Sequence, residues 1–76
     1  MGESMIDVSF KLKDGRMATI YTDRSVFHYQ CYLMIAGNIH TQPYNRSWDF
    51  KTEQEAIDKA NSLIASYEER GTILVP

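Results

Sequence analysis

Residues 52–71 read TEQEAIDKANSLIASYEERG and contain every local signal of an amphipathic helix. Thr52 and Glu55 form a T-x-x-E capping box, in which each side chain accepts a hydrogen bond from the other residue's backbone N–H. Gly71 can adopt the left-handed conformation that ends a helix. Between these limits, apolar residues recur at the i, i+3, i+4, i+7 spacing of one buried face: Ala56, Ile57, Ala60, Leu63, Ile64 and Tyr67. The stretch therefore predicts a C-terminal helix with one face available to a core.

The chain before this helix begins with a predicted β-hairpin. Residues 6–12 alternate apolar and polar side chains, which is the period of a half-buried strand. Asp14-Gly15 is the signal of a two-residue hairpin turn. In the register that such a turn sets, Leu12 faces Met17 and Val8 faces Tyr21. We therefore expect Met17 and Tyr21 on the core side of the second strand, residues 16–22.

Two further strands follow. Residues 26–36 (VFHYQCYLMIA) are the most β-prone segment of the chain, and apolar side chains occur on both faces. Gly37-Asn38 predicts a second two-residue turn, after which a fourth strand starts at Ile39. Pro43 cannot donate a ladder hydrogen bond, so this strand is expected at an edge and interrupted or bulged near Pro43. In this register Cys31 faces Tyr44, and His40 faces residue 35.

These elements predict one α+β domain over residues 5–76: a four-stranded antiparallel β-meander packed by one C-terminal helix. Residues 72–75 (TILV) either dock on the sheet or form a short fifth strand, and residues 1–4 are a disordered or non-native tail. The expected core consists of the following residues: Val8, Phe10, Leu12, Ile20 or Tyr21, Phe27, Cys31, Leu33, Ile35, Ile57, Ala60, Leu63 and Ile64.

Composition limits the class of protein. The 76 residues are 43% hydrophobic and 24% charged, with a net charge of −2, as expected for a compact domain. Cys31 is the sole cysteine, so an intramolecular disulfide is impossible. The longest nearly apolar run, residues 31–36, is far shorter than the ~20 residues of a membrane span, and no leader pattern is visible. We expect a cytoplasmic protein.

The sequence does not predict an enzyme, a cofactor or a metal site. His28 and Cys31 are three residues apart on one predicted strand, so their side chains point to opposite faces. His40 lies too far along the neighbouring strand to act as a base for Cys31, and a fourth metal ligand is missing. The glycines show no G-x-G spacing for a phosphate loop.

The leading functional hypothesis is a non-enzymatic protein that acts by protein–protein contact. Glu68 and Glu69 oppose the helix dipole and gain nothing locally, so they are either part of a solvated surface or contacts for a basic partner. Small acidic domains of this kind occur among phage or mobile-element inhibitors of the anti-CRISPR or anti-restriction type. The candidate contacts combine helix acids with Trp, Tyr and Arg anchors of the edge strand: Asp58, Glu68, Glu69, Tyr44, Arg46 and Trp48.

Two alternatives stay open. The first is direct nucleic-acid binding, in which sheet aromatics stack on bases and basic residues contact phosphates, through Tyr29, Tyr32, Arg46, Trp48 and Lys51. The junction formed by Phe50, Thr52, Glu55 and Ala56 resembles the strand-to-helix layout of WGR-type nucleic-acid-binding domains and of arm-binding domains of phage integrases.

The second alternative is a homodimer that forms through the apolar second face of residues 26–36.

Overall fold

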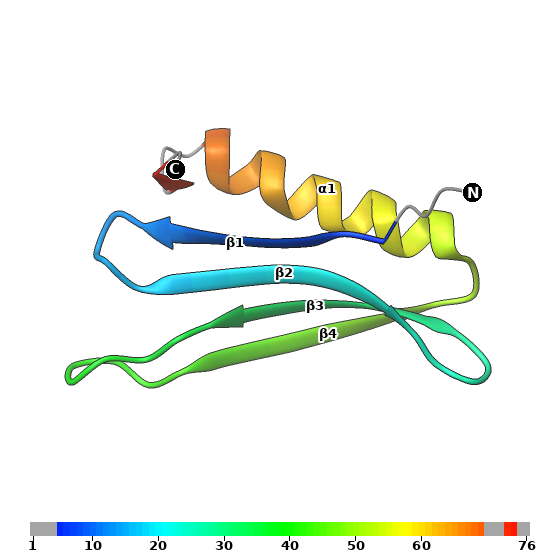
Figure 1. The fold of residues 1–76 in the computed structure, drawn as a ribbon, viewed down its shortest axis with the longest axis horizontal. Coiled ribbons are helices and arrows are strands. Elements are labelled where there is room, and N and C mark those ends of the chain that lie inside the picture. Colours follow the sequence, from blue (N-terminus) through cyan, green and yellow to red (C-terminus); the bar gives the residue numbers. More distant parts are fainter. Residues whose placement is uncertain (1–4, 70–72, 75–76) are drawn as a thin grey trace.

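The computed structural model describes residues 5–69 and 73–74 and contains one antiparallel sheet with one helix on a single face (Figure 1). The sheet order is β4-β3-β2-β1-β5, so β4 lies at one edge and β5 pairs with β1. The predicted α+β meander is confirmed, and of the two expectations for the C-terminal residues, the short fifth strand is the one observed. The elements are β1 (Asp7–Leu12), β2 (Met17–Arg24), β3 (Tyr29–Ile35), β4 (Tyr44–Phe50), α1 (Glu53–Glu69) and β5 (Ile73–Leu74).

Helix α1 starts where the capping box predicts. The backbone N–H of Glu55 donates to Oγ1 of Thr52 over 3.2 Å, and the N–H of Thr52 donates to Oε1 of Glu55 over 3.2 Å. These two bonds satisfy backbone donors that have no partner inside the helix. The predicted end at Gly71 lies outside the described residues.

The predicted register of the first hairpin is wrong by one residue. The turn contains three residues, 13–15, because the N–H of Gly15 donates to the carbonyl of Leu12 over 2.9 Å and Gly15 has a φ of 93°. Such a turn ends in a left-handed residue that forms a bulge. Strand β1 therefore pairs Val8 with Ile20. Since side chains alternate between faces, Ile20 points to the core while Met17 and Tyr21 point away from it.

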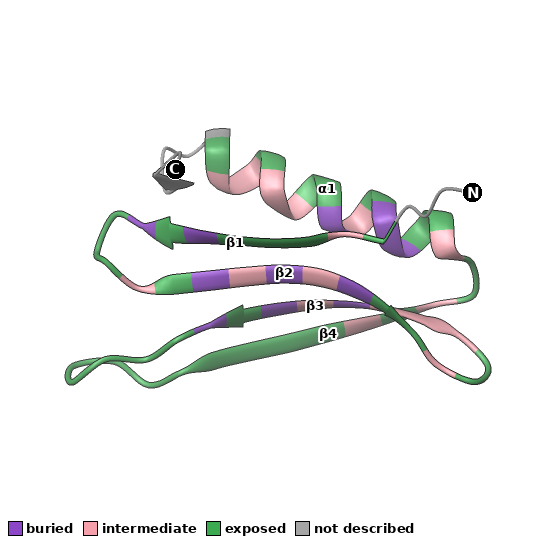
Figure 2. Ribbon diagram, in the orientation of Figure 1, coloured by how far each residue is buried: buried purple, intermediate pink, exposed green. Residues whose placement is uncertain are grey.

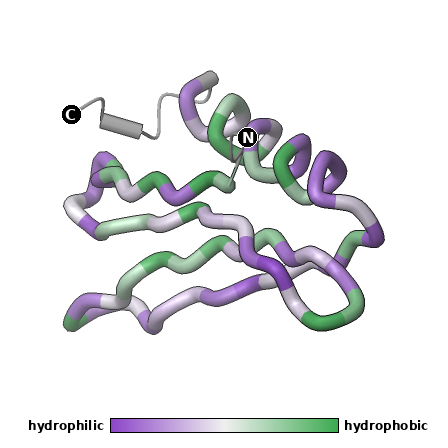
Figure 3. The backbone as a smooth tube through the Cα atoms, turned by 45° about the vertical axis from the view of Figure 1, so that its right-hand side comes forward, coloured by the Kyte–Doolittle hydropathy of each residue, from purple (hydrophilic) through white to green (hydrophobic). Residues whose placement is uncertain are grey.

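The predicted start of the third strand is also wrong. Val26 and Phe27 are the two central residues of the β2–β3 turn, which is closed by the N–H of Ser25 donating to the carbonyl of His28 over 2.8 Å. Their exposed fractions are 85% and 92%, so Phe27 is not a core residue. The turn projects beyond the last paired residues of the sheet, and its hydrophobic tip is visible in Figure 3. A β-prone composition does not distinguish a strand from the turn that precedes it.

The β3–β4 connection is longer than the predicted two-residue turn. It runs over residues 36–43, and Ile35 faces Tyr44 rather than His40. Oδ1 of Asn38 accepts hydrogen bonds from the backbone N–H groups of His40 and Thr41 over 2.7 and 2.9 Å. These backbone groups therefore bond within the loop and do not pair with a neighbouring strand. Strand β4 starts after Pro43 and is the predicted edge strand, without an interruption.

The core lies between α1 and the face of β1, β2 and β3 that the helix covers (Figure 2). Val8 is 38% exposed and does not belong to it, whereas Ala18 is buried although it was not expected. Ala56, which the helix pattern places on the buried face, is buried. Leu63 and Ile64 are partly buried against the core. The remaining expected residues are buried as predicted: Phe10, Leu12, Ile20, Cys31, Leu33, Ile35, Ile57 and Ala60.

Candidate functional site

The sheet face opposite α1, called the open face below, is not covered by any described helix or strand (Figure 1). The observed registers place large side chains on it, because alternate residues of each strand point to the same side. Met17 and Met34 remain 46% and 41% exposed there. The central residues of the open face come from three strands: Met17, Thr19, Tyr21, Tyr32, Met34, Asn45 and Ser47.

A pair of stacked tyrosines forms the middle of the open face. The rings of Tyr21 and Tyr32 face each other across β2 and β3, with centroids 4.7 Å apart and planes at 15°. The Tyr32 hydroxyl donates to Oε1 of Gln30, whose Nε2 donates to Oδ1 of Asp49 over 3.0 Å. This chain of contacts orients the Tyr32 ring, and stacking of two aromatic rings adds stability beyond the area that they bury.

Negative charge lies at one end of this tyrosine pair. Burial raises the pKa of the Tyr32 phenol, and the neighbouring Tyr21 and two carboxylates act in the same direction. The carboxylates are those of Asp23 and Asp49. An anionic phenolate is disfavoured in such surroundings, so Tyr32 acts as a neutral hydrogen-bonding ring.

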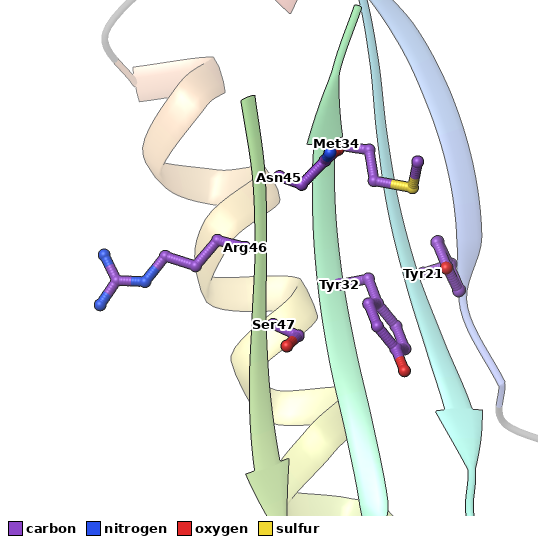
Figure 4. Close-up of a pocket in the computed structure, with 6 residues that line it drawn as sticks. All are labelled: Tyr21, Tyr32, Met34, Asn45, Arg46 and Ser47. Atoms are coloured by element: carbon purple, nitrogen blue, oxygen red, sulfur yellow. The ribbon is translucent and has the colours of Figure 1, made fainter. Parts of the chain in front are cut away.

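A groove runs beside the tyrosines toward the sheet edge. It has a volume of about 360 Å³, and an adjoining hollow of about 290 Å³ shares Met34 and Asn45 with it. Tyr21, Tyr32 and Met34 form its apolar side (Figure 4). Asn45 and Ser47 supply polar groups, while the Arg46 side chain points away from the groove, past the edge of β4. The groove thus combines apolar area with a few polar groups, a composition that pockets for bound groups commonly have.

Three predicted contacts lie together on the α1 side of β4. The Arg46 guanidinium lies 5.0 Å from the centre of the Trp48 ring, and Nζ of Lys59 lies 4.5 Å from the same ring. Both are cation–π distances. Tyr44 is 44% exposed and points to the same side of β4. Nothing in the sequence singles out Lys59, since it reaches Trp48 only after α1 folds against the sheet.

The predicted acidic contacts do not join this cluster as a group. Asp58 is exposed and accepts a hydrogen bond from Nε2 of Gln54 over 2.9 Å. Glu68 is exposed ten residues later, about 15 Å away along the helix axis. Glu69 is the last residue of α1, and its side chain lies outside the described part of the structure.

The five residues of the nucleic-acid hypothesis are divided between two sides of the sheet. Tyr32 belongs to the open face, whereas Tyr29, Arg46 and Trp48 point to the α1 side. Lys51 follows β4 and is exposed. A single strand of nucleic acid cannot contact all five by lying on one face.

Cys31 and the two histidines are separated in space. Cys31 is fully buried on the α1 side, where burial raises the pKa of its thiol and Lys59 partly offsets that effect. Nε2 of His28 lies 3.4 Å from Oδ1 of Asp49 and makes no hydrogen bond. His40 lies in the β3–β4 loop. Over residues 5–69 and 73–74, no group of three or more potential ligands (His, Cys, Asp or Glu) could hold a metal ion.

Sequence reasoning missed Tyr21, Met34, Asn45 and Ser47 as site residues. The signal that could have found them is whether the first turn has an even or an odd number of residues. A three-residue turn points Tyr21 away from the core, and Tyr32, which pairs with Tyr21, points to the same side.

Within the described residues, no helix is long and apolar enough to cross a membrane. Comparison of the chain with protein-family models, with curated proteins and with solved structures gave no significant match.

Proposed function

We propose that this chain is a non-enzymatic binding protein that contacts a protein partner through the open face. The observation that supports this proposal is the groove beside the stacked Tyr21 and Tyr32, with the thioether of Met34 exposed next to it. Aromatic side chains and methionine are enriched at protein interfaces, and an adaptable Met side chain suits an apolar partner group. A cytoplasmic location remains part of this proposal.

The charge of the open face indicates the chemistry of the partner. On strands β1–β4, three carboxylates point to this side and Lys11 is the one basic residue. The carboxylates belong to Asp7, Asp23 and Asp49. They repel phosphates and attract Lys or Arg, so the proposed partner surface combines an apolar group with basic residues.

A basic partner surface fits the inhibitor class that the small acidic chain suggested. Proteins that bind nucleic acid have basic surfaces, and an acidic protein can occupy such a surface in place of phosphates. We therefore propose an inhibitor or regulator of the phage or mobile-element type, of which anti-CRISPR and anti-restriction proteins are examples.

A single charge substitution tests the open face. Met34→Asp places a carboxylate in the groove, and Asn61→Asp places the same charge on an exposed position of α1. Proteins captured from the native host by the wild type are quantified by mass spectrometry for all three chains. We expect a partner that Asn61→Asp retains and Met34→Asp loses by about tenfold or more, which corresponds to ~1.4 kcal/mol. Equal capture by both variants would contradict the proposal.

The helix acids need their own variant. Glu68→Gln combined with Glu69→Gln removes two charges that oppose the helix dipole, so helix stability is expected to rise slightly. Loss of the captured partner in this double variant, with retention in Met34→Asp, would move the contact from the open face to α1.

Nucleic-acid binding is kept as a second candidate because of one observation, the two cations on the Trp48 ring. Arg46 and Lys59 could contact phosphates while Trp48 stacks on a base. The test is binding of a mixed oligonucleotide pool at low and at higher salt. Affinity that falls by orders of magnitude between the two conditions would support this candidate, and absence of binding at low salt would exclude it.

A further inference from the structure

Strand β4 offers an unpaired edge. It is the last strand of the sheet, and within the described residues it pairs only with β3. Its seven residues run without a proline, since Pro43 lies just before the strand. The N–H and C=O groups that point away from β3 can therefore accept a further antiparallel strand.

The sequence of β4 is complementary to itself in one antiparallel register. With Ser47 facing Ser47 of a second copy, Asn45 faces Asp49 on the open face, so an amide can donate to a carboxylate. On the α1 side, the same register sets Arg46 opposite Trp48, which repeats between chains the cation–π contact present within one chain. All seven residues are paired, with the two aromatic rings at the ends facing each other: Tyr44 and Phe50.

The neighbouring registers lack this complementarity. A two-fold axis perpendicular to the sheet keeps corresponding faces of the two copies on the same side. The axis must then lie between two copies of the same residue, which face each other across the strand pair. An axis at Arg46 or at Asp49 sets like charges opposite each other, which is unfavourable. An axis at Trp48 pairs only residues 46–50 and leaves Tyr44 without a strand partner. Only the axis at Ser47 uses the whole strand.

We propose that β4 is a self-association surface, through which two copies join their sheets into one continuous sheet. Both α1 helices then lie on one side, and the two open-face grooves meet near the axis, since Asn45 and Ser47 line the groove. This edge-to-edge contact differs from an association through the second face of β3. It does not rest on the proposed function, because it needs no other partner.

Charge placement at Ser47 and Asn45 tests the dimer and its register. Both residues are exposed on the same face of β4. Ser47→Lys sets two ammonium groups opposite each other and is expected to abolish association. Asn45→Lys adds the same charge but faces Asp49 of the second copy, so association is expected to persist or strengthen. Circular dichroism of each variant checks that the fold is intact.

Sedimentation equilibrium from micromolar to millimolar concentration gives the readout. The wild type and Asn45→Lys should approach twice the 8.8 kDa mass of one chain, while Ser47→Lys stays at that mass. A wild type that remains monomeric at millimolar concentration would overturn the proposal. Equal weakening by both substitutions, or no effect of either on a dimer, would also overturn it.

Cysteine cross-linking tests the axis directly. Facing residues of an antiparallel pair have Cα atoms about 4.5–5.5 Å apart, within the range of a disulfide. Ser47→Cys should therefore cross-link with itself, by oxidation or with a short bis-maleimide. Asn45→Cys should not, because its copies would lie about 13 Å apart along the strands. Mixing Asn45→Cys with Asp49→Cys should restore the cross-link. Self-linking of Asn45→Cys in place of Ser47→Cys would contradict the register.

Discussion

The two faces of this sheet are built from the same strands, yet the side chains on them differ in how far they are buried. On the face that α1 covers, Ile20 and Cys31 are fully buried. On the open face, residues one position away along β2 and β3 include the stacked Tyr21 and Tyr32, and Met34 remains 41% exposed. Alternation along a strand therefore separates the residues that stabilise the fold from those left for a contact.

The largest expected difference between the faces concerns the deletion of one side chain from each. Ile20→Ala should lower the free energy of unfolding by about 2–5 kcal/mol, because it leaves a cavity between α1 and the sheet. Met34→Ala should change it by roughly 0.5 kcal/mol, as is usual for surface positions. Urea unfolding followed by circular dichroism measures both. Similar losses for the two variants would break the distinction between the faces.

The next effect concerns the helix that makes one face a core. Thr52→Ala removes the capping-box hydroxyl without touching either sheet face and should cost about 1 kcal/mol. Ser62→Ala, at an exposed position inside α1, is the control and should be neutral or stabilising by a few tenths of a kcal/mol. Thermal and urea unfolding compare them, and an unchanged Thr52→Ala protein would show that the cap is not needed.

A smaller effect measures what the open face adds to stability. Tyr21→Leu, Tyr32→Leu and the double variant form a double-mutant cycle for the stacked rings. We expect a coupling free energy of about 0.5–1 kcal/mol in favour of the pair. A coupling near zero would mean that the two rings stabilise the fold only through separate contacts and are available to a partner without loss.

The smallest effect is a pH dependence of the covered face. Burial raises the pKa of Cys31 above its ordinary value of 9.0, so the unfolded chain releases this proton first as pH rises. The free energy of unfolding should therefore fall as pH increases from that value to the raised pKa. Cys31→Ala should show a shallower fall over the same window. Equal slopes for both proteins would indicate a solvent-accessible thiol.

The sequence predicted the parts of the fold that depend on local chemistry. The capping box and the apolar stripe located α1, and Pro43 placed β4 at an edge. These predictions succeeded because each signal depends only on residues that lie close together in the sequence.

The registers failed because they depend on turn length. The left-handed Gly15 closes a three-residue turn, and the Asn38 side chain holds an eight-residue loop, neither of which follows from strand propensity. The open face could not be predicted for the same reason, since one residue of register decides whether Tyr21 points toward α1 or away from it. Trp48 was expected to be a contact residue, but its neighbour Lys59 became visible only in the folded chain.

The three-residue turn before β2 also limits how this chain can change in length. Insertion or loss of one residue there would move every side chain of β1 to the opposite face of the sheet. Phe10 and Leu12 would then point to solvent, and Lys11 would point toward the helix. A change of two residues would keep every side chain on its own side. Length variation at this hairpin should therefore be tolerated in steps of two, and the constraint comes from the core, several residues away from the turn itself.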